Sequence, residues 1–97
     1  MKFKVKTNKS MSDVVRTVGY SETYLQDGGQ VSVVKKLGGD YPRFHLYIKK
    51  ENDGFNFDLH LDQKKPSYGG SHAHSGEYDG ELIEQESERI KSFFKGA

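Results

Sequence analysis

Two consecutive segments, residues 43–50 and 55–62, alternate between apolar and polar side chains, with Lys50 as the one exception. This period of two puts all the apolar side chains on one side of an extended strand and the polar ones on the other. The apolar positions are Phe44, Leu46 and Ile48 in the first segment and Phe55, Phe57, Leu59 and Leu61 in the second. Residues 51–54 lie between them and contain the Asp-Gly pair that is common in tight β-turns. The pattern predicts an antiparallel hairpin with one buried face and one polar face.

The position of the turn decides the register of this hairpin. If Asp53-Gly54 is the two-residue loop, His45 faces Asp62 and Tyr47 faces His60. If Asn52-Asp53 is the loop, His45 faces His60 directly. Both registers pair apolar with apolar residues, so both remain open. Either way, one polar face carries His45, Tyr47, Asp58, His60 and Asp62.

The N-terminal part of the chain predicts a strand and a short helix. Residues 2–7 alternate lysine with apolar residues, which is typical of an edge strand. A helix is expected to begin after a cap at Ser10 or Ser12 and to end at Gly19. Its three valines are poor helix formers, so a strand is the alternative.

The C-terminal segment predicts a longer helix, with Asp79 as its cap and Gly96 after its last turn. Glutamates gather toward its start and lysines toward its end, which complements the helix dipole. Its expected apolar stripe consists of Leu82, Ile83, Ile90, Phe93 and Phe94, with Glu86 and Ser87 as weaker positions.

Two further strands are expected at residues 21–26 and 30–37, around a glycine-rich turn. We therefore predict an α+β fold with a single domain over residues 1–97. It is a two-layer sandwich: a mostly antiparallel sheet of about four to five strands, with the C-terminal helix and the short N-terminal helix on one face. The other face of the sheet is open and polar.

Composition limits the classes of protein that fit. The chain has 97 residues, a mean hydropathy of −0.84 and no cysteine. The absence of cysteine excludes a disulfide framework and thiolate metal sites, and it is consistent with a cytoplasmic location. No apolar run is long enough to span a bilayer, so no membrane association is expected. Residues 1–50 carry a charge of about +6 and residues 51–97 about −5. We interpret these as complementary halves of one domain, because the basic residues are scattered.

Residues 63–80 are rich in glycine, serine and histidine and predict a long loop, which in a compact domain is typically functional or disordered. His72-Ala73-His74 could provide two metal ligands, and His45 or His60 a third. Asp58, Asp62 and Glu77 could add a carboxylate. Zinc or manganese would suit such a site.

A metal-bound water could then act as the nucleophile in a hydrolysis, with Asp62 or Glu77 as general base. Ser71 and Ser75 beside the histidines are a further candidate for acid–base chemistry. The alternative is that the loop histidines are simply exposed to solvent.

Other residues suggest binding without a metal. Lys64 and Lys65 could contact phosphate, and Tyr47 on the open face, between Arg43 and Lys49, suggests a stacking platform. Asp58 and Asp62 on that face would repel a phosphate backbone. Tyr68 and Tyr78 in the loop could contact a protein partner.

The sequence therefore leads to two functional hypotheses. The first is a small ligand-binding domain with a divalent-metal site under the 63–80 loop, which could be hydrolytic. The alternative is a metal-free binding module for nucleic acid or a protein partner.

Overall fold

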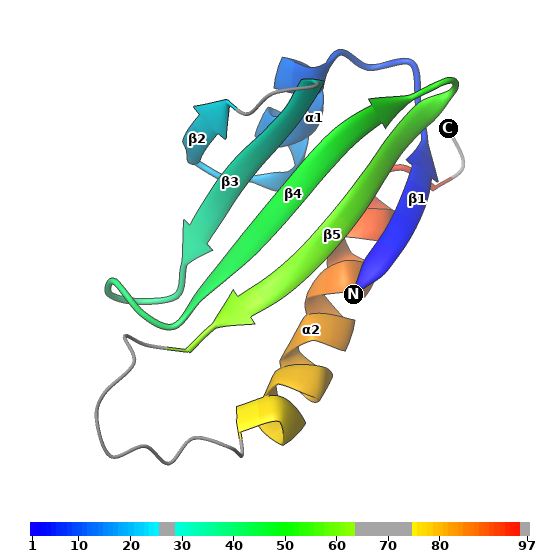
Figure 1. Cartoon of the computed structure of the whole chain (residues 1–97). Coiled ribbons are helices and arrows are strands. Elements are labelled where there is room, and N and C mark those ends of the chain that lie inside the picture. The colour runs from blue at the N-terminus through cyan, green and yellow to red at the C-terminus, as the bar shows by residue number, and fades with distance from the viewer. Residues whose placement is uncertain (26–28, 64–74, 96–97) are drawn as a thin grey trace.

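The computed structural model describes residues 1–25, 29–63 and 75–95, and their side chains except those of residues 22–25 and 75–79. The elements in chain order are β1 (Lys2–Lys6), α1 (Met11–Val18), β2 (Glu22–Leu25), β3 (Gln30–Lys36), β4 (Arg43–Glu51), β5 (Gly54–Asp62) and α2 (Ser75–Ser92). The strands form one antiparallel sheet in the order β1-β5-β4-β3-β2, and both helices lie on the same face of it (Figure 1). The predicted α+β sandwich is thus confirmed.

The hairpin of β4 and β5 is the centre of the sheet. Its register pairs Ile48 with Phe57 and His45 with His60, so the turn is at Asn52-Asp53. Gly54 therefore belongs to β5, where it is paired across to Lys6 of β1. A Cβ atom on Gly54 would overlap the carbonyl oxygen of Val5 and lie 2.8 Å from the Cα of Lys6. Close approach of β1, and not the turn itself, requires glycine here.

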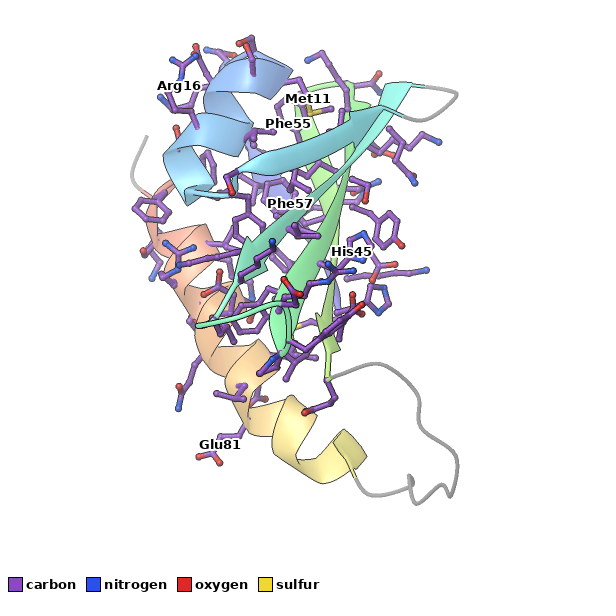
Figure 2. The ribbon with its side chains drawn as sticks, turned by 90° about the vertical axis from the view of Figure 1, so that its left-hand side faces the viewer. Met11, Arg16, His45, Phe55, Phe57 and Glu81 are labelled. Atoms are coloured by element: carbon purple, nitrogen blue, oxygen red, sulfur yellow. The ribbon has the colours of Figure 1, made fainter. Side chains whose placement is uncertain are left out.

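The apolar sides of the strands and the inner sides of both helices make a single core. Phe55 and Phe57 lie between the sheet and the helices, whereas His45 lies on the opposite side of the sheet (Figure 2). The fully buried members with less than 2% exposure include Leu46, Ile48, Leu59, Ile90, Val14, Val18 and Val33. One side of each strand is thus used entirely by packing.

Helix α1 forms as predicted. The hydroxyl of Ser10 accepts a hydrogen bond from the backbone N–H of Asp13, which caps the first turn. Gly19 ends the helix in the left-handed conformation, with φ of 84°. Val14 and Val18 are fully buried, and this packing outweighs the low helix propensity of valine.

Helix α2 differs from its prediction at the start. It begins at Ser75, so residues 75–80 are helical, and Asp79 does not cap it. The prediction of a loop over residues 63–80 is therefore wrong for residues 75–80, and residues 64–74 lie outside the described part of the chain. Gly76 and Gly80, which suggested irregular structure, each cost a helix only about 1 kcal/mol relative to alanine. Once a long helix has nucleated, each added residue gains a hydrogen bond, so such glycines are tolerated.

The buried side of α2 also differs from the expected stripe. Ile90 and Phe94 are buried, but Leu82 and Phe93 are each at least 40% exposed. Glu86 and Ser87, the weaker positions of the expected stripe, are buried at 6% and 1% exposure. The helix is thus turned so that a carboxylate faces the core.

Hydrogen bonds compensate for the burial of Glu86. The hydroxyl of Tyr20 donates to its carboxylate at 2.7 Å, and the guanidinium of Arg89 donates to both oxygens at 2.8 and 2.9 Å. Arg89 also donates to the backbone carbonyl of Val18 at 2.7 Å. This cluster, Tyr20–Glu86–Arg89, connects the end of α1 to the middle of α2.

Candidate binding site on the open sheet face

Three cross-strand rows cover the central part of the open sheet face. One row is Tyr47, Asp58 and Lys2, on β4, β5 and β1. The next row along the strands is Lys49, Asn56 and Lys4, and the row on the other side begins with the pair His45 and His60. The alternation of each strand requires this arrangement once the register is fixed.

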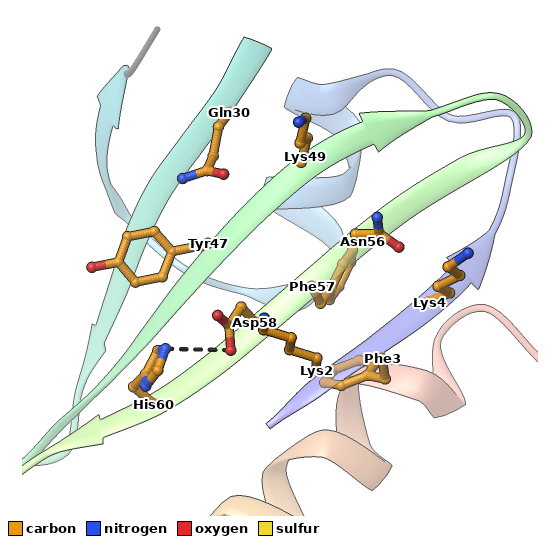
Figure 3. Close-up of a pocket in the computed structure, with 10 residues that line it drawn as sticks. All are labelled: Lys2, Phe3, Lys4, Gln30, Tyr47, Lys49, Asn56, Phe57, Asp58 and His60. Carbon is orange, nitrogen blue, oxygen red and sulfur yellow. Dashed lines mark ion pairs between the residues drawn. The ribbon is translucent and has the colours of Figure 1, made fainter. Parts of the chain in front are cut away.

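These rows border an open groove of about 700 Å³ (Figure 3). The groove residues are Lys2, Phe3, Lys4, Gln30, Tyr47, Lys49, Asn56, Phe57, Asp58 and His60. By the alternation, Phe3 and Phe57 direct their rings toward the core and contribute backbone to the groove. The rings available at its surface therefore belong to Tyr47 and His60.

The groove carries an excess of positive charge. Its three lysines face one carboxylate, that of Asp58. His60 Nε2 lies 3.3 Å from Asp58 Oδ1, and the amino group of Met1 lies 3.6 Å from the same oxygen. Asp58 is thus already partnered.

The groove lysines, unlike Asp58, have few ion-pair partners within the described residues. Among the described residues, Lys4 has only a long, exposed ion pair with Glu51, at 3.9 Å. Lys2 and Lys49 form no ion pair with any part of the chain that the structure describes. Their charges are available to a ligand.

Tyr47 is fixed by two histidine rings. Its ring stacks on that of His45, with centroids 4.6 Å apart and planes inclined by 17°. The ring of His60 is perpendicular to it, with centroids 5.6 Å apart and planes at 89°. Because His45 does not line the groove and Tyr47 does, the stacked histidine supports the tyrosine from outside the groove.

His45 is itself held at both ring nitrogens. Its Nε2 lies 2.6 Å from the hydroxyl of Ser32 on β3, and its Nδ1 lies 3.3 Å from Asp62 on β5. Arg43 donates to the same oxygen of Asp62 at 3.4 Å. We refer to Ser32, His45 and Asp62 as the histidine relay.

The order of groups in the histidine relay is that of a serine-hydrolase triad. Ser32 is only 2% exposed, however, and does not line the groove, so no substrate carbonyl can reach its hydroxyl. The relay orients the His45 ring, and through it Tyr47. Ser32 is not among the site residues predicted from the sequence, although the alternation of residues 30–33 puts it on the open face.

The structure brings together only some of the residues predicted from the sequence. His45, Tyr47, Asp58, His60 and Asp62 share one face. The two histidines and two aspartates form separate pairs, His60 with Asp58 and His45 with Asp62. Within the described residues, no group of three histidines or carboxylates could hold a metal ion.

The other predicted site residues are placed differently. Lys64, Lys65, Tyr68, His72 and His74 lie outside the described residues. Glu77 and Tyr78 belong to the first turns of α2 and not to a loop, which corrects the prediction. Their side chains are not among those described.

Comparison with known protein families, with curated proteins and with solved structures finds no match for this chain. Neither helix, over its described residues, has the length and apolarity needed to cross a bilayer.

Proposed function

We propose that the protein is a binding module that takes a phosphate-bearing anion in the groove on the open sheet face. The observation that carries this proposal is the imbalance of charge: three lysines border the groove, and its one carboxylate is already paired. Flexible lysines around a concave surface attract anions from solution and hold phosphates.

Two aspartates on the open face, Asp58 and Asp62, would be expected to repel a phosphate. This repulsion is reduced because each aspartate has a cationic or hydrogen-bonding neighbour. Asp58 lies beside His60, and Asp62 accepts from Arg43 and contacts His45. The field that a ligand meets is therefore dominated by the lysines.

A direct test is binding of a fluorescent polyphosphate chain to the full-length protein, followed by anisotropy at several salt concentrations. Lys2→Gln/Lys49→Gln removes two groove charges, and Lys9→Gln/Lys95→Gln is the matched control because both residues are exposed and neither lines the groove. With three lysine–phosphate contacts, affinity should fall roughly tenfold or more between 50 and 200 mM salt. The groove variant should lower the slope of log K against log salt by about 1.4.

Equal salt slopes for the two double variants would contradict the proposal, as would binding that does not depend on salt. A cytoplasmic location, expected from the sequence, is part of the proposal because phosphorylated ligands are abundant there.

A divalent-metal site is the second candidate function. The observation that favours it is the contact of His60 with Asp58 at 3.3 Å, since a histidine and a carboxylate are two of the ligands that zinc accepts. His72 and His74 would have to complete the site, with Asp62 or Glu77 as base if the site is hydrolytic.

A further inference from the structure

We infer that the anion is a single-stranded nucleic acid and that one of its bases stacks on Tyr47. This inference rests on the proposed phosphate-binding function and adds the chemical class of the ligand. It starts from the position of an aromatic ring inside a lysine-bordered groove.

The ring of Tyr47 is not part of the hydrophobic core. It lies on the open face of the central strand, and its hydroxyl makes no hydrogen bond within the part of the chain that the structure describes. A flat ring supported from behind by His45 is a preorganised surface for stacking. Nucleobases stack on such rings with little dependence on sequence.

The second argument is the spacing of charge around that ring. Lys49 is two residues further along β4, which is about 7 Å. Lys2 lies two strands away in the same row as Tyr47, which is roughly 10 Å. Lysine side chains are long enough to close these distances, so a base on Tyr47 would have cations on two sides for its flanking phosphates. Figure 3 shows the three residues around the groove.

The third argument distinguishes single strands from duplexes. In a duplex each base is stacked between its neighbours, so its face cannot meet a tyrosine ring without unstacking. A single strand exposes these faces. Asn56 lies in the groove beside the lysines and can donate to or accept from a base edge or a sugar hydroxyl.

The test compares four labelled probes by anisotropy: oligo-dT and oligo-U of eight nucleotides, an abasic phosphodiester of the same length, and a DNA duplex. The proteins are the wild type, Tyr47→Leu, Tyr47→Phe and Lys2→Gln/Lys49→Gln. Circular dichroism and thermal melting confirm that each variant is folded.

Loss of the ring should weaken binding of at least one base-bearing single strand roughly 5- to 100-fold in Tyr47→Leu, whereas Tyr47→Phe keeps the ring and stays within about twofold. The abasic probe should bind the wild type more weakly and should not distinguish the two Tyr47 variants. The ratio of the oligo-dT and oligo-U affinities then says which sugar the groove prefers.

The inference is overturned if the abasic probe or the duplex binds as tightly as the single strands, or if Tyr47→Leu binds like the wild type. In each of those cases a loss of binding in Lys2→Gln/Lys49→Gln would still support a phosphate site. If no probe shows lysine-dependent binding, the proposed function itself fails, so the two failures are distinguishable.

Discussion

Replacement of Tyr20 by phenylalanine tests how the buried carboxylate of Glu86 stabilises the fold. Tyr20 is 4% exposed, and its hydroxyl donates to Glu86 at 2.7 Å. Burial, with the carboxylate beside it, raises the pKa of Tyr20 far above its ordinary value, so the phenol stays a donor at every relevant pH. The variant removes only this donor.

The expected loss of stability in Tyr20→Phe depends on the hydrogen bonds that Glu86 keeps. A hydrogen bond to a charged group contributes about 1.5–3 kcal/mol to stability. In Tyr20→Phe the guanidinium of Arg89 still satisfies both carboxylate oxygens, so no buried oxygen is left without a donor. We therefore expect the lower end, about 1.5 kcal/mol, which corresponds to a fall in Tm of roughly 6–12 °C for a domain of this size.

The effect should depend on pH with a definite sign. Burial alone would raise the pKa of Glu86, but the hydrogen bonds from Arg89 and Tyr20 outweigh it, and the pKa lies below its ordinary value of 4.5. A depressed pKa in the folded state stabilises the protein above the unfolded pKa, and this stabilisation is lost as pH falls through the folded pKa. The difference between the wild type and the variant should be constant from pH 7 to about 5 and decrease below about 4.5.

Urea unfolding at a series of pH values measures both quantities. Tyr41→Phe is the matched control, because its hydroxyl makes no hydrogen bond within the described residues. A loss at pH 7 below about 0.5 kcal/mol for Tyr20→Phe, equal to that of the control, would refute the energetic role assigned to the cluster. A difference that grows on acidification would refute the assigned direction of the Glu86 pKa.

Three further outcomes are expected. Gly54→Ala should cost at least about 2 kcal/mol in urea unfolding because its Cβ meets the backbone of β1, whereas Gly39→Ala, which meets nothing closer than 3.9 Å, should stay within about 0.5 kcal/mol; equal losses would argue against the close approach. Ser32→Ala should lower stability by about 1 kcal/mol and weaken ligand binding a few-fold, and labelling of Ser32 by a fluorophosphonate would contradict its assignment as a positioning residue. In calorimetric titrations with zinc and manganese, His72→Ala/His74→Ala should bind more weakly than the wild type, and equal affinities would remove the metal hypothesis.

Local periodicity predicted most of the fold because each strand carries its own two faces. The hairpin and the fold class follow from spacing, and helix α1 from its capping residues Ser10 and Gly19, although its valines left a strand as the alternative. The register of the hairpin could not be predicted, because a loop at Asn52-Asp53 and a loop at Asp53-Gly54 both pair apolar with apolar residues. In the observed register Gly54 lies in β5 close to the backbone of Val5, 49 positions away, and no local pattern reports this contact.

The same limit applies to the candidate site. Alternation placed His45, Tyr47 and His60 on one face, but the neighbours of a strand are a property of the whole sheet. Lys2 and Lys4 border the groove only because β1 pairs with β5, which brings the start of the chain beside its middle. At helix α2 the local signal was misleading. Gly76 and Gly80 indicated a loop, but both are part of the helix, because a long helix gains a hydrogen bond with each added residue.

The two faces of the sheet differ in their side chains: one face packs into the core and the other is open. A binding function is therefore expected on the open face. The core face is filled by residues whose volume is fixed by packing, so it has no freedom to carry ligand chemistry. On the open face, Ser32 and Asp62 contact both ring nitrogens of His45 and orient its ring. The ring of His45 in turn stacks on Tyr47. This chain of contacts crosses three strands and ends at the half-buried ring of Tyr47. Its consequence is an oriented aromatic ring beside Lys2 and Lys49, which form no ion pair within the described residues, and a stacked, charged ligand requires such an arrangement.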